Sequence, residues 1–291
     1  MMMGKTAMNK FSYSYEDIKK LLPERKENSN KGSCGRVLII GGSPCMAGAP
    51  YFSAKAAYRT GCGLVEVFTH EDNRVILQTL IPEAVLSTWS ENIDFNKLEA
   101  SIKKADVIAI GMGLSTSEAA LEILLFTLEK CNCPIVIDAD ALNLIARNKN
   151  LFKYIKHDAI ITPHPLEMSR ISSVEVEEIT KNIPEFAQKF ANENTVICVL
   201  KDHRTAVASP DADYIYINQS GNSGMSTGGS GDVLDGIIAG LLAQGCDPYI
   251  AATLGVYIHG LAGDVASEIL SQYSLMASDI IDALPEIFNS L

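Results

Sequence analysis

A glycine-rich stretch that contains a carboxylate is the part of this sequence best suited to chemistry. It runs from residue 221 to residue 236 and reads Gly-Asn-Ser-Gly-Met-Ser-Thr-Gly-Gly-Ser-Gly-Asp-Val-Leu-Asp-Gly. The apolar run 237–242 follows at once, which predicts a loop leading into the first turn of a buried helix. A helix start leaves backbone N–H groups free, and glycines let an anion approach them closely. We therefore predict an anion hole for a phosphate at Gly228, Gly229, Ser230 and Gly231.

Asp232 is the carboxylate at this predicted helix start. A bound phosphate would repel it, so a carboxylate at this place suits a general base that takes a proton from a hydroxyl about to attack phosphorus. The alternative is that Asp232 only caps its helix, as aspartate often does. Short glycine motifs often arise by chance, so the Gly-x-Gly-Asp pattern alone leaves both interpretations open.

The elements that must position this loop alternate along the chain between strand and helix patterns. Near-continuous, β-branched apolar runs predict strands at 36–40, 64–68, 84–86, 106–110, 134–137, 159–161 and 196–200. A hairpin is predicted from the runs 205–208 and 214–217. Helices are predicted at 11–22 and, toward the end of the chain, at about 231–244, 248–268 and 277–289. The alternation predicts an α/β fold with a mostly parallel central sheet covered by helices on both faces.

Residues with special chemistry follow the carboxyl ends of these strands. They are the Gly41-Gly42 turn, the Gly111-Met112-Gly113 turn, Asp138, His164 and Lys201. In an open parallel sheet, the ligand crevice lies outside this edge. We therefore expect one pocket to collect these five places and the glycine-rich loop.

Three of these five places also have a purely structural interpretation. His164 lies between two prolines and could simply satisfy backbone groups of its turn. Asp138 and Asp140 could make turn and cap interactions rather than bind a metal. Lys201 could be an edge lysine that extends its charged end to water, or it could contact a phosphate.

Composition argues against several classes of function. The net charge of −11 disfavours binding to nucleic acid or to an anionic membrane surface. The chain has neither a Gly-x-Gly-x-x-Gly turn nor a P-loop. Its seven cysteines form no Cys-x-x-Cys pair, and we expect them to be small buried hydrophobes in a reducing cytosol. Without a signal peptide or an apolar run of about 20 residues, the protein is expected to be cytoplasmic.

Five separated motifs, in one order, resemble those of the NAD(P)H-hydrate dehydratase family of the ribokinase-like superfamily. Besides the glycine-rich loop, they are residues 41–49, 111–114, 162–167 and 201–205. The chain departs from the family pattern at Met112, Leu166, Asp202 and Ser226. The resemblance implies a ribokinase-like fold in a single domain over 1–291, with a short N-terminal extension at about 1–10. We expect no epimerase domain in front, although some family members carry one.

The same resemblance implies a role for individual residues. Asp232 would be the catalytic base. The substrate would be contacted by Ala49, Gly113, His164 and Asp232. The nucleotide would be contacted by Lys201, Asp202, His203, Arg204, Thr205 and Gly231. Asp138 and Asn143 would lie near the phosphates or a magnesium ion, and no metal ligand is assigned.

The implied reaction repairs hydrated NADH and NADPH, in which water has added across the nicotinamide ring. A nucleotide would phosphorylate the ring hydroxyl of the S epimer, and elimination would restore the reduced ring. The resemblance implies ADP rather than ATP, giving AMP and phosphate, with Mg²⁺ as cofactor, in a homo-oligomer that is commonly a tetramer. The alternatives are a kinase of the same fold acting on a small alcohol, of the hydroxyethylthiazole or pyridoxine type, and a non-catalytic nucleotide sensor.

Overall fold

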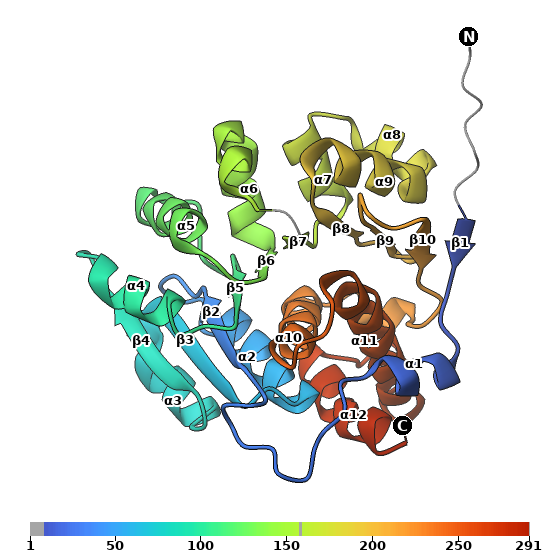
Figure 1. Cartoon of the computed structure of the whole chain (residues 1–291), viewed down its shortest axis with the longest axis horizontal. Helices are drawn as coiled ribbons and strands as arrows, with labels where there is room; N and C mark the ends of the chain where they lie inside the picture. The colour runs from blue at the N-terminus through green and yellow to red at the C-terminus, as the bar shows by residue number, and fades with distance from the viewer. Residues whose placement is uncertain (1–8, 157–158, 291) are drawn as a thin grey trace.

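The fold is built on one large sheet, seen in a computed structural model that describes residues 9–156 and 159–290 (Figure 1). Its strand order is β1-β10-β9-β8-β7-β6-β5-β2-β3-β4. Every neighbouring pair is parallel except the two pairs made by β9, which runs antiparallel to β8 and β10. The strands are β1 (Asn9–Phe11), β2 (Arg36–Ile40), β3 (Leu64–His70), β4 (Val85–Trp89), β5 (Val107–Ile110), β6 (Ile135–Ile137), β7 (Ile160–Ile161), β8 (Ile197–Leu200), β9 (Ala206–Ala208) and β10 (Tyr214–Ile217).

Helices connect the strands and cover the sheet. The α-helices are α1 (Tyr15–Leu21), α2 (Gly48–Thr60), α3 (Arg74–Leu80), α4 (Phe95–Ile102), α5 (Glu118–Lys130), α6 (Ala139–Arg147), α7 (Pro165–Ser172), α8 (Val176–Lys181), α9 (Ile183–Asn194), α10 (Ser230–Ala243), α11 (Pro248–Leu270) and α12 (Ala277–Ser290). Short 3₁₀ turns are η1 (Glu71–Asn73), η2 (Lys149–Tyr154) and η3 (Ser223–Met225). Over residues 9–156 and 159–290, no helix is both long enough and apolar enough to cross a membrane.

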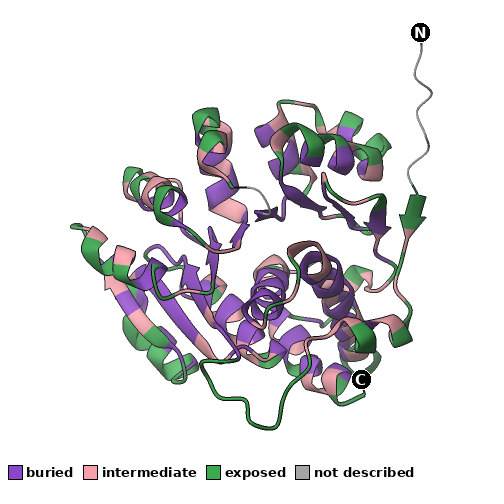
Figure 2. Ribbon diagram, in the orientation of Figure 1, coloured by how far each residue is buried: buried purple, intermediate pink, exposed green. Residues whose placement is uncertain are grey.

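The sheet has a hydrophobic core on each face, as the near-continuous apolar strands predict. Within β2, Val37 and Ile39 belong to one core while Leu38 and Ile40 belong to the other. Successive side chains of a strand point to opposite faces, so a strand covered on both sides must be apolar throughout. Helices α2, α10, α11 and α12 supply the first core, and α4, α5, α6, α7 and α9 supply the second (Figures 1 and 2). The predicted α/β architecture is confirmed.

Close contact between α2 and α10 fixes the place where α10 begins. A Cβ atom on Gly236 would lie 2.3 Å from the Ser53 carbonyl oxygen, and one on Gly240 would lie 2.9 Å from the Ala57 carbonyl oxygen. Both glycines are therefore needed for the two backbones to approach this closely. Because α2 follows the Gly41-Gly42 turn, this packing brings the first glycine-rich turn of the chain beside the last one.

The sequence patterns located most elements to within a few residues. The hairpin of β9 and β10 and the three C-terminal helices are confirmed. The single helix predicted at 11–22 is wrong at its start, because residues 9–11 form β1 and the helix covers only Tyr15–Leu21. β1 was missed because a three-residue strand carries no periodic signal, and its parallel partner β10 lies about 200 residues away. Residues 1–8 of the predicted N-terminal extension lie outside the described residues.

Candidate active site

A cavity of about 770 Å³ opens at the carboxyl edge of the sheet. Its walls come from the turn 201–205 after β8, the loop 220–227, the first turn of α10 and the middle of α11. His164, Lys201 and Gly231 line it, as do all the other residues predicted to contact a nucleotide. The sequence-based expectation that these separated motifs meet in space is therefore confirmed for this half of the site.

The backbone at the start of α10 presents free amides. Among the residues that the structure describes, the N–H groups of Gly228, Gly229 and Gly231 have no hydrogen-bond acceptor. The Ser230 amide differs, because it donates to the Thr227 carbonyl oxygen at 3.3 Å. The predicted anion hole thus has three free amides rather than four. Ser230 can contribute its hydroxyl instead, which lies 3.3 Å from His259 Nε2.

Gly229 gives this loop its shape. It precedes α10 with φ of 91°, in the left-handed region that side chains other than glycine rarely adopt. A Cβ atom there would also lie 2.6 Å from the ring of Phe52 on α2. Gly228 is open, with no atom within 4 Å of an ideal Cβ position. Gly228 therefore borders open space, while Gly229 packs against Phe52.

The Asp232 carboxylate lies in the first turn of α10 without capping it. The helix is preceded by Gly229 and has no side-chain cap, and no hydrogen bond to this carboxylate is present among residues 9–156 and 159–290. The structure therefore gives no support to the interpretation of Asp232 as a cap. Its backbone carbonyl accepts from the Ser53 hydroxyl at 2.8 Å, which ties this turn to α2.

The surroundings of Asp232 favour a proton acceptor at neutral pH. Burial and, after it, the Asp138 carboxylate raise the pKa of Asp232 to about 7, although the Lys201 ammonium opposes both. A general base works best when its pKa lies near the working pH. A carboxylate that caps a helix accepts hydrogen bonds from backbone amides, and these hydrogen bonds would favour its ionised form and lower its pKa.

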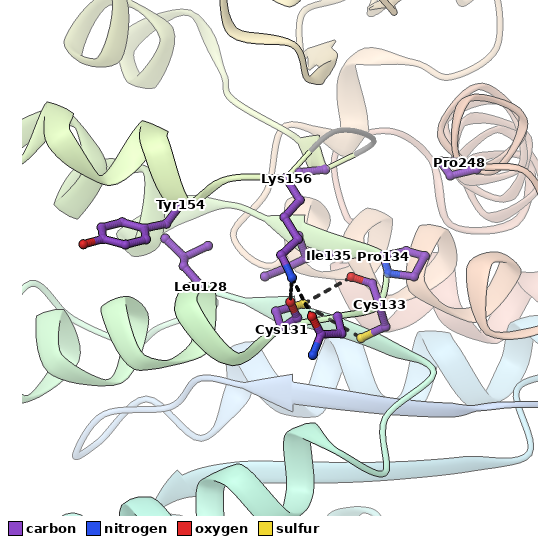
Figure 3. A pocket seen from close by; sticks show the side chains of 10 residues that line it. Leu128, Cys131, Cys133, Pro134, Ile135, Tyr154, Lys156 and Pro248 are labelled. Atoms are coloured by element: carbon purple, nitrogen blue, oxygen red, sulfur yellow. Dashed lines mark hydrogen bonds between the residues drawn. The ribbon is translucent and has the colours of Figure 1, made fainter.

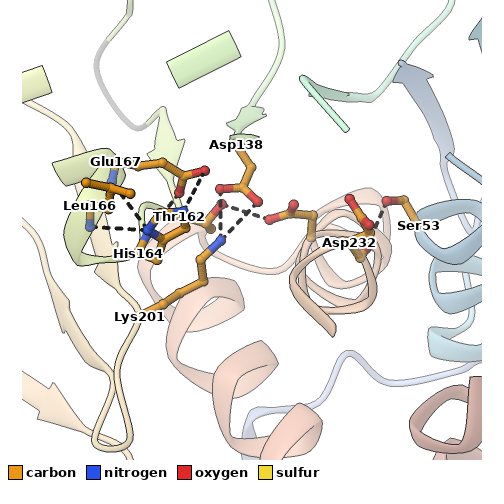
Figure 4. A network of polar contacts seen from close by, with 9 residues as sticks. Ser53, Asp138, Thr162, His164, Leu166, Glu167, Lys201 and Asp232 are labelled. Carbon is orange, nitrogen blue, oxygen red and sulfur yellow. Dashed lines mark hydrogen bonds and ion pairs between the residues drawn. The ribbon is translucent and has the colours of Figure 1, made fainter. Parts of the chain in front are cut away.

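Lys201 forms a nearly buried ion pair with Asp138 at the same sheet edge (Figure 4). Its Nζ lies 2.9 Å and 3.0 Å from the two carboxylate oxygens. A Cβ atom on Gly231 would lie 3.4 Å from this Nζ, so the ammonium borders the first turn of α10. Burial lowers the pKa of Lys201, but the charges of Asp138, Asp235 and Glu167 outweigh it and the net pKa is raised. The lysine stays charged beside the free amides, where it can attract an anion.

Asp235, one turn further along α10, is a buried carboxyl that sequence reasoning missed. Its Oδ1 accepts from the Thr162 hydroxyl at 2.8 Å, while its Oδ2 has no hydrogen-bond partner among the described residues. Burial and the neighbouring Asp138 charge raise the pKa of Asp235 well above its ordinary value. An aspartate inside an otherwise apolar helix was the available signal.

His164 both caps a helix and lines the cavity. Its Nδ1 accepts from the amides of Leu166 and Glu167 at 3.2 Å and 3.3 Å, so the ring begins α7. The Glu167 carboxylate accepts from the His164 amide at 2.9 Å and completes a capping box. His164 thus satisfies backbone groups of its turn, as its structural interpretation predicts. Its side chain is nevertheless 46% exposed and lines the cavity. Its predicted contact with substrate remains a prediction.

The turn 202–205 is closed by its own side chains. The Thr205 hydroxyl donates to the Asp202 carbonyl oxygen at 3.1 Å, and Asp202 Oδ1 accepts from the His203 amide at 2.7 Å. Arg204 donates to the Gln219 carbonyl oxygen at 2.9 Å, which joins the turn to the residue just before the loop 220–227. Asp202, which departs from the family pattern, therefore directs its carboxylate at its own turn.

Ala49 and Gly113 lie next to each other at the start of α2. A Cβ atom on Gly113 would lie 3.1 Å from the Ala49 Cβ, and the Gly113 carbonyl accepts from the Ser43 amide at 2.7 Å. Neither residue lines the cavity of 770 Å³, and Asp138, Gly228, Gly229 and Asp232 do not line it either. The expectation of a single pocket is therefore wrong in this respect. Ser53 connects Ala49 to Asp232, since its hydroxyl also lies 3.4 Å from the Ala49 carbonyl oxygen.

The predicted metal neighbours are already engaged by cationic side chains. Both oxygens of Asp138 bind Lys201, and Asn143 Oδ1 accepts from Arg170 at 2.7 Å. In the part of the chain that the structure describes, no cluster of three or more His, Cys, Asp or Glu residues could hold a metal ion. These residues do not form a metal site made of protein ligands alone. Magnesium usually keeps several waters and binds through substrate phosphates, which is the form this site could accept.

Helix α11 holds the loop 220–227 in place through residues that the sequence patterns did not single out. The Asp264 carboxylate accepts from the Gly221 amide at 2.8 Å and from Asn222 Nδ2 at 2.9 Å. Burial lowers the pKa of His259 to about 4, so its ring is neutral where it meets Ser230. The available signal for His259 and Asp264 was the presence of two polar residues, five positions apart, in an otherwise apolar helix.

These features define the class of protein. A mostly parallel sheet with a glycine-rich loop and a carboxylate at the start of a late helix is the arrangement of ribokinase-like α/β proteins. A solved ribokinase-like superfamily protein from Enterococcus faecalis is similar over the whole chain, with a TM-score of 0.85, 30% identity and coverage of 100% of this chain and 98% of that chain. The chain belongs to the NAD(P)H-hydrate dehydratase family, whose model matches residues 37–286.

Relatives with named activities support the same family. The chain is 40% identical over 250 residues to an ADP-dependent (S)-NAD(P)H-hydrate dehydratase from Neisseria meningitidis, covering 84% of this chain and 81% of that one. It is 39% identical to a bifunctional NAD(P)H-hydrate repair enzyme Nnr from Moorella thermoacetica, covering 93% of this chain and 52% of that one. The chain thus spans about half the length of such bifunctional relatives. A solved ADP/ATP-dependent NAD(P)H-hydrate dehydratase from Bacillus subtilis, co-crystallised with ATP/Mg²⁺, has a TM-score of 0.82, 28% identity and coverage of 98% and 99%.

Proposed function

We propose that this protein is an ADP-dependent dehydratase of hydrated NADH and NADPH, specific for the S epimer. The observation that carries the proposal is the position of Asp232. Its carboxylate has no hydrogen-bond partner among the described residues. Asp232 belongs to the turn that carries the free amides, and its backbone carbonyl accepts from the Ser53 hydroxyl, which also lies 3.4 Å from the Ala49 carbonyl oxygen. A base placed between a phosphate cradle and a second ligand surface suits phosphoryl transfer to a hydroxyl.

The reaction balances with the groups present. Asp232 takes the proton of the ring hydroxyl, whose oxygen attacks the terminal phosphorus of ADP. The bond between that phosphorus and the bridging oxygen breaks, and AMP leaves. The ring carbon–oxygen bond of the new phosphate ester then breaks with loss of a ring proton, which releases phosphate and restores NADH or NADPH. The oxygen of the water that had added to the ring leaves within the phosphate.

The free amides and Lys201 supply the electrostatic part of this step. The N–H groups of Gly228, Gly229 and Gly231 would bind the transferring phosphoryl group, and the Lys201 ammonium would offset its charge. Magnesium carried by the nucleotide phosphates would neutralise further charge. The ATP/Mg²⁺ complex of the Bacillus subtilis relative supports a nucleotide with magnesium in this family.

The two sides of Asp232 would bind the two substrates. The cavity lined by residues 201–205 and by Gly231 is the proposed nucleotide site. Ala49 and Gly113, with His164 at the border, form the proposed site for the hydrated nicotinamide. We also propose that the chain acts as one domain, since all ten strands of the described residues join one sheet. We propose further that the protein is cytoplasmic and forms a homotetramer. Light scattering tests the tetramer.

The function is tested by restoring the reduced ring. Purified protein is incubated with hydrated NADH, Mg²⁺ and either ADP or ATP, and recovery of the absorbance of the reduced nicotinamide is followed. We expect recovery, faster with ADP, and one AMP formed per ring restored. No recovery with either nucleotide, together with phosphorylation of hydroxyethylthiazole or a pyridoxine-like alcohol, would assign a kinase instead. Nucleotide binding without turnover of any of these compounds would assign a sensor.

A further inference from the structure

Two thiols line a second cavity (Figure 3). They precede the first residue of β6, whereas Asp138 follows its last residue. This cavity has a volume of about 210 Å³ and is bordered by Cys131, Cys133, Lys156 and Pro248 among others. The two Sγ atoms are 3.9 Å apart, and Cys131 Sγ lies 3.1 Å from the Cys133 carbonyl oxygen. Cys131 ends α5 and Cys133 precedes β6, so both belong to one short connection. The sulfur atoms are thus in contact beside a space large enough for a small molecule.

A positive charge lies beside this pair. Lys156 Nζ donates to the Cys131 carbonyl oxygen and, at 2.7 Å, to Asn132 Oδ1. An ammonium group at this place disfavours a bound metal cation and favours a thiolate. The hydrogen bond with the Cys133 thiol lowers the pKa of Cys131 to about 7, against the effect of burial and with help from Lys156. The same hydrogen bond raises the pKa of Cys133, as do burial and the Asp106 charge.

We propose that Cys131 and Cys133 form a peroxide-reactive dithiol site that closes to a disulfide. The Cys131 thiolate attacks one oxygen of hydrogen peroxide, the oxygen–oxygen bond breaks, and a sulfenic acid and hydroxide form. Cys133 then attacks the Cys131 sulfur, a sulfur–sulfur bond replaces the sulfur–oxygen bond, and the Cys133 proton leaves with the hydroxyl as water. Two thiols and one peroxide thus give one disulfide and two waters.

Other cysteines lack this combination. Burial raises the pKa of Cys62 and of Cys246 to about 12, and it also raises the pKa of Cys198. These thiols stay protonated at neutral pH and are poor nucleophiles. Cys45 is exposed and is the matched control, since it is accessible to peroxide but lies outside the pair. The expectation that the cysteines are buried is therefore wrong for Cys45. It is confirmed for Cys131, while Cys133 and Cys246 are half-buried.

Peptide masses test the site without any activity assay. The intact protein is treated with hydrogen peroxide, free thiols are alkylated, and the protein is cleaved with trypsin. Lys130 and Arg147 bound a peptide, 131–147, whose cysteines are Cys131 and Cys133. We expect this peptide to lose two hydrogen atoms, to carry no alkyl group, and to return to the dialkylated form after reduction. Its oxidation should be roughly tenfold faster at pH 8 than at pH 6, following the thiolate fraction.

A matched variant separates the two steps. In Cys133→Ser, we expect a sulfenic acid on Cys131 that dimedone captures, and no loss of two hydrogen atoms. The proposal is overturned if peptide 131–147 stays dialkylated at a peroxide concentration that oxidises Cys45. Protection of both thiols by Zn²⁺ at micromolar concentration would also overturn it, in favour of a metal site. Because the readout is a mass, the result is independent of the proposed dehydratase activity.

Discussion

The Lys201 ammonium bridges both carboxylate oxygens of Asp138, at 2.9 Å and 3.0 Å, directly beside the first turn of α10. The two residues come from the ends of β8 and β6, strands separated in the sheet by β7. Their contact joins the cavity lined by residues 201–205 to the first turn of α10. It also sets the electrostatics of α10, because Asp138 raises and Lys201 lowers the pKa of both Asp232 and Asp235.

Breaking this ion pair should separate its structural role from its role in binding. Lys201→Met leaves the Asp138 carboxylate buried without its partner, which should lower the free energy of unfolding by about 3 kcal/mol. The double variant Lys201→Met/Asp138→Asn removes the stranded charge and should regain most of that loss in a urea titration. Both variants should show a KM for ADP at least about tenfold higher, since each lacks the ammonium beside the amides. If the double variant regained the wild-type KM for ADP as well as the wild-type stability, the ion pair would have only a structural role.

The buried Asp235 carboxyl should make stability depend on pH. Its pKa is raised in the folded protein, while an aspartate in the unfolded chain has a pKa of about 3.9. Between these values the folded state holds a proton that the unfolded state has lost, so stability falls as pH rises. Asp235→Asn keeps a partner for Thr162 and removes this titration. Its melting temperature should exceed that of the wild type by a margin that widens above about pH 4; a constant margin would contradict the assignment.

The fold was more readable from the sequence than the site. Apolar runs located β2, β3 and β5 because a strand buried on both faces must be apolar throughout. Short strands such as β1 depend on a distant partner and escape such patterns. Sequence motifs located the free amides and Asp232, but they did not single out Asp235 or Asp264. The burial and hydrogen bonds of an aspartate within a helix depend on which residues pack against that side of the helix, and these residues are distant in sequence.

The Asp264 carboxylate should act on nucleotide binding rather than on chemistry. It accepts two hydrogen bonds from the loop 220–227, so Asp264→Asn should loosen that wall of the cavity. Hydrogen bonds to a charged group contribute about 1.5–3 kcal/mol each, and partial loss should raise the KM for ADP about tenfold with little change in kcat. Glu268→Gln, an exposed change on the same helix, is the control. Equal effects of the two variants would show that Asp264 has no specific role.

The pH dependence of turnover should report Asp232. Burial and the Asp138 charge raise its pKa to about 7, and a base must be deprotonated to accept a proton. We expect kcat/KM to fall about tenfold per pH unit below that value and to level off above it. A profile that is flat between pH 5 and 8 would contradict the assignment of Asp232 as the base.

Replacing Asp232 by asparagine tests the account most directly. The carboxylate makes no cap hydrogen bond, so Asp232→Asn should melt at the wild-type temperature or above it. Removing a general base typically costs 10²–10⁴-fold in rate, and we expect a loss of about that size in restoration of hydrated NADH with ADP and Mg²⁺. A well-folded variant that restores the reduced ring at a near wild-type rate would show that this carboxylate takes no proton from the substrate.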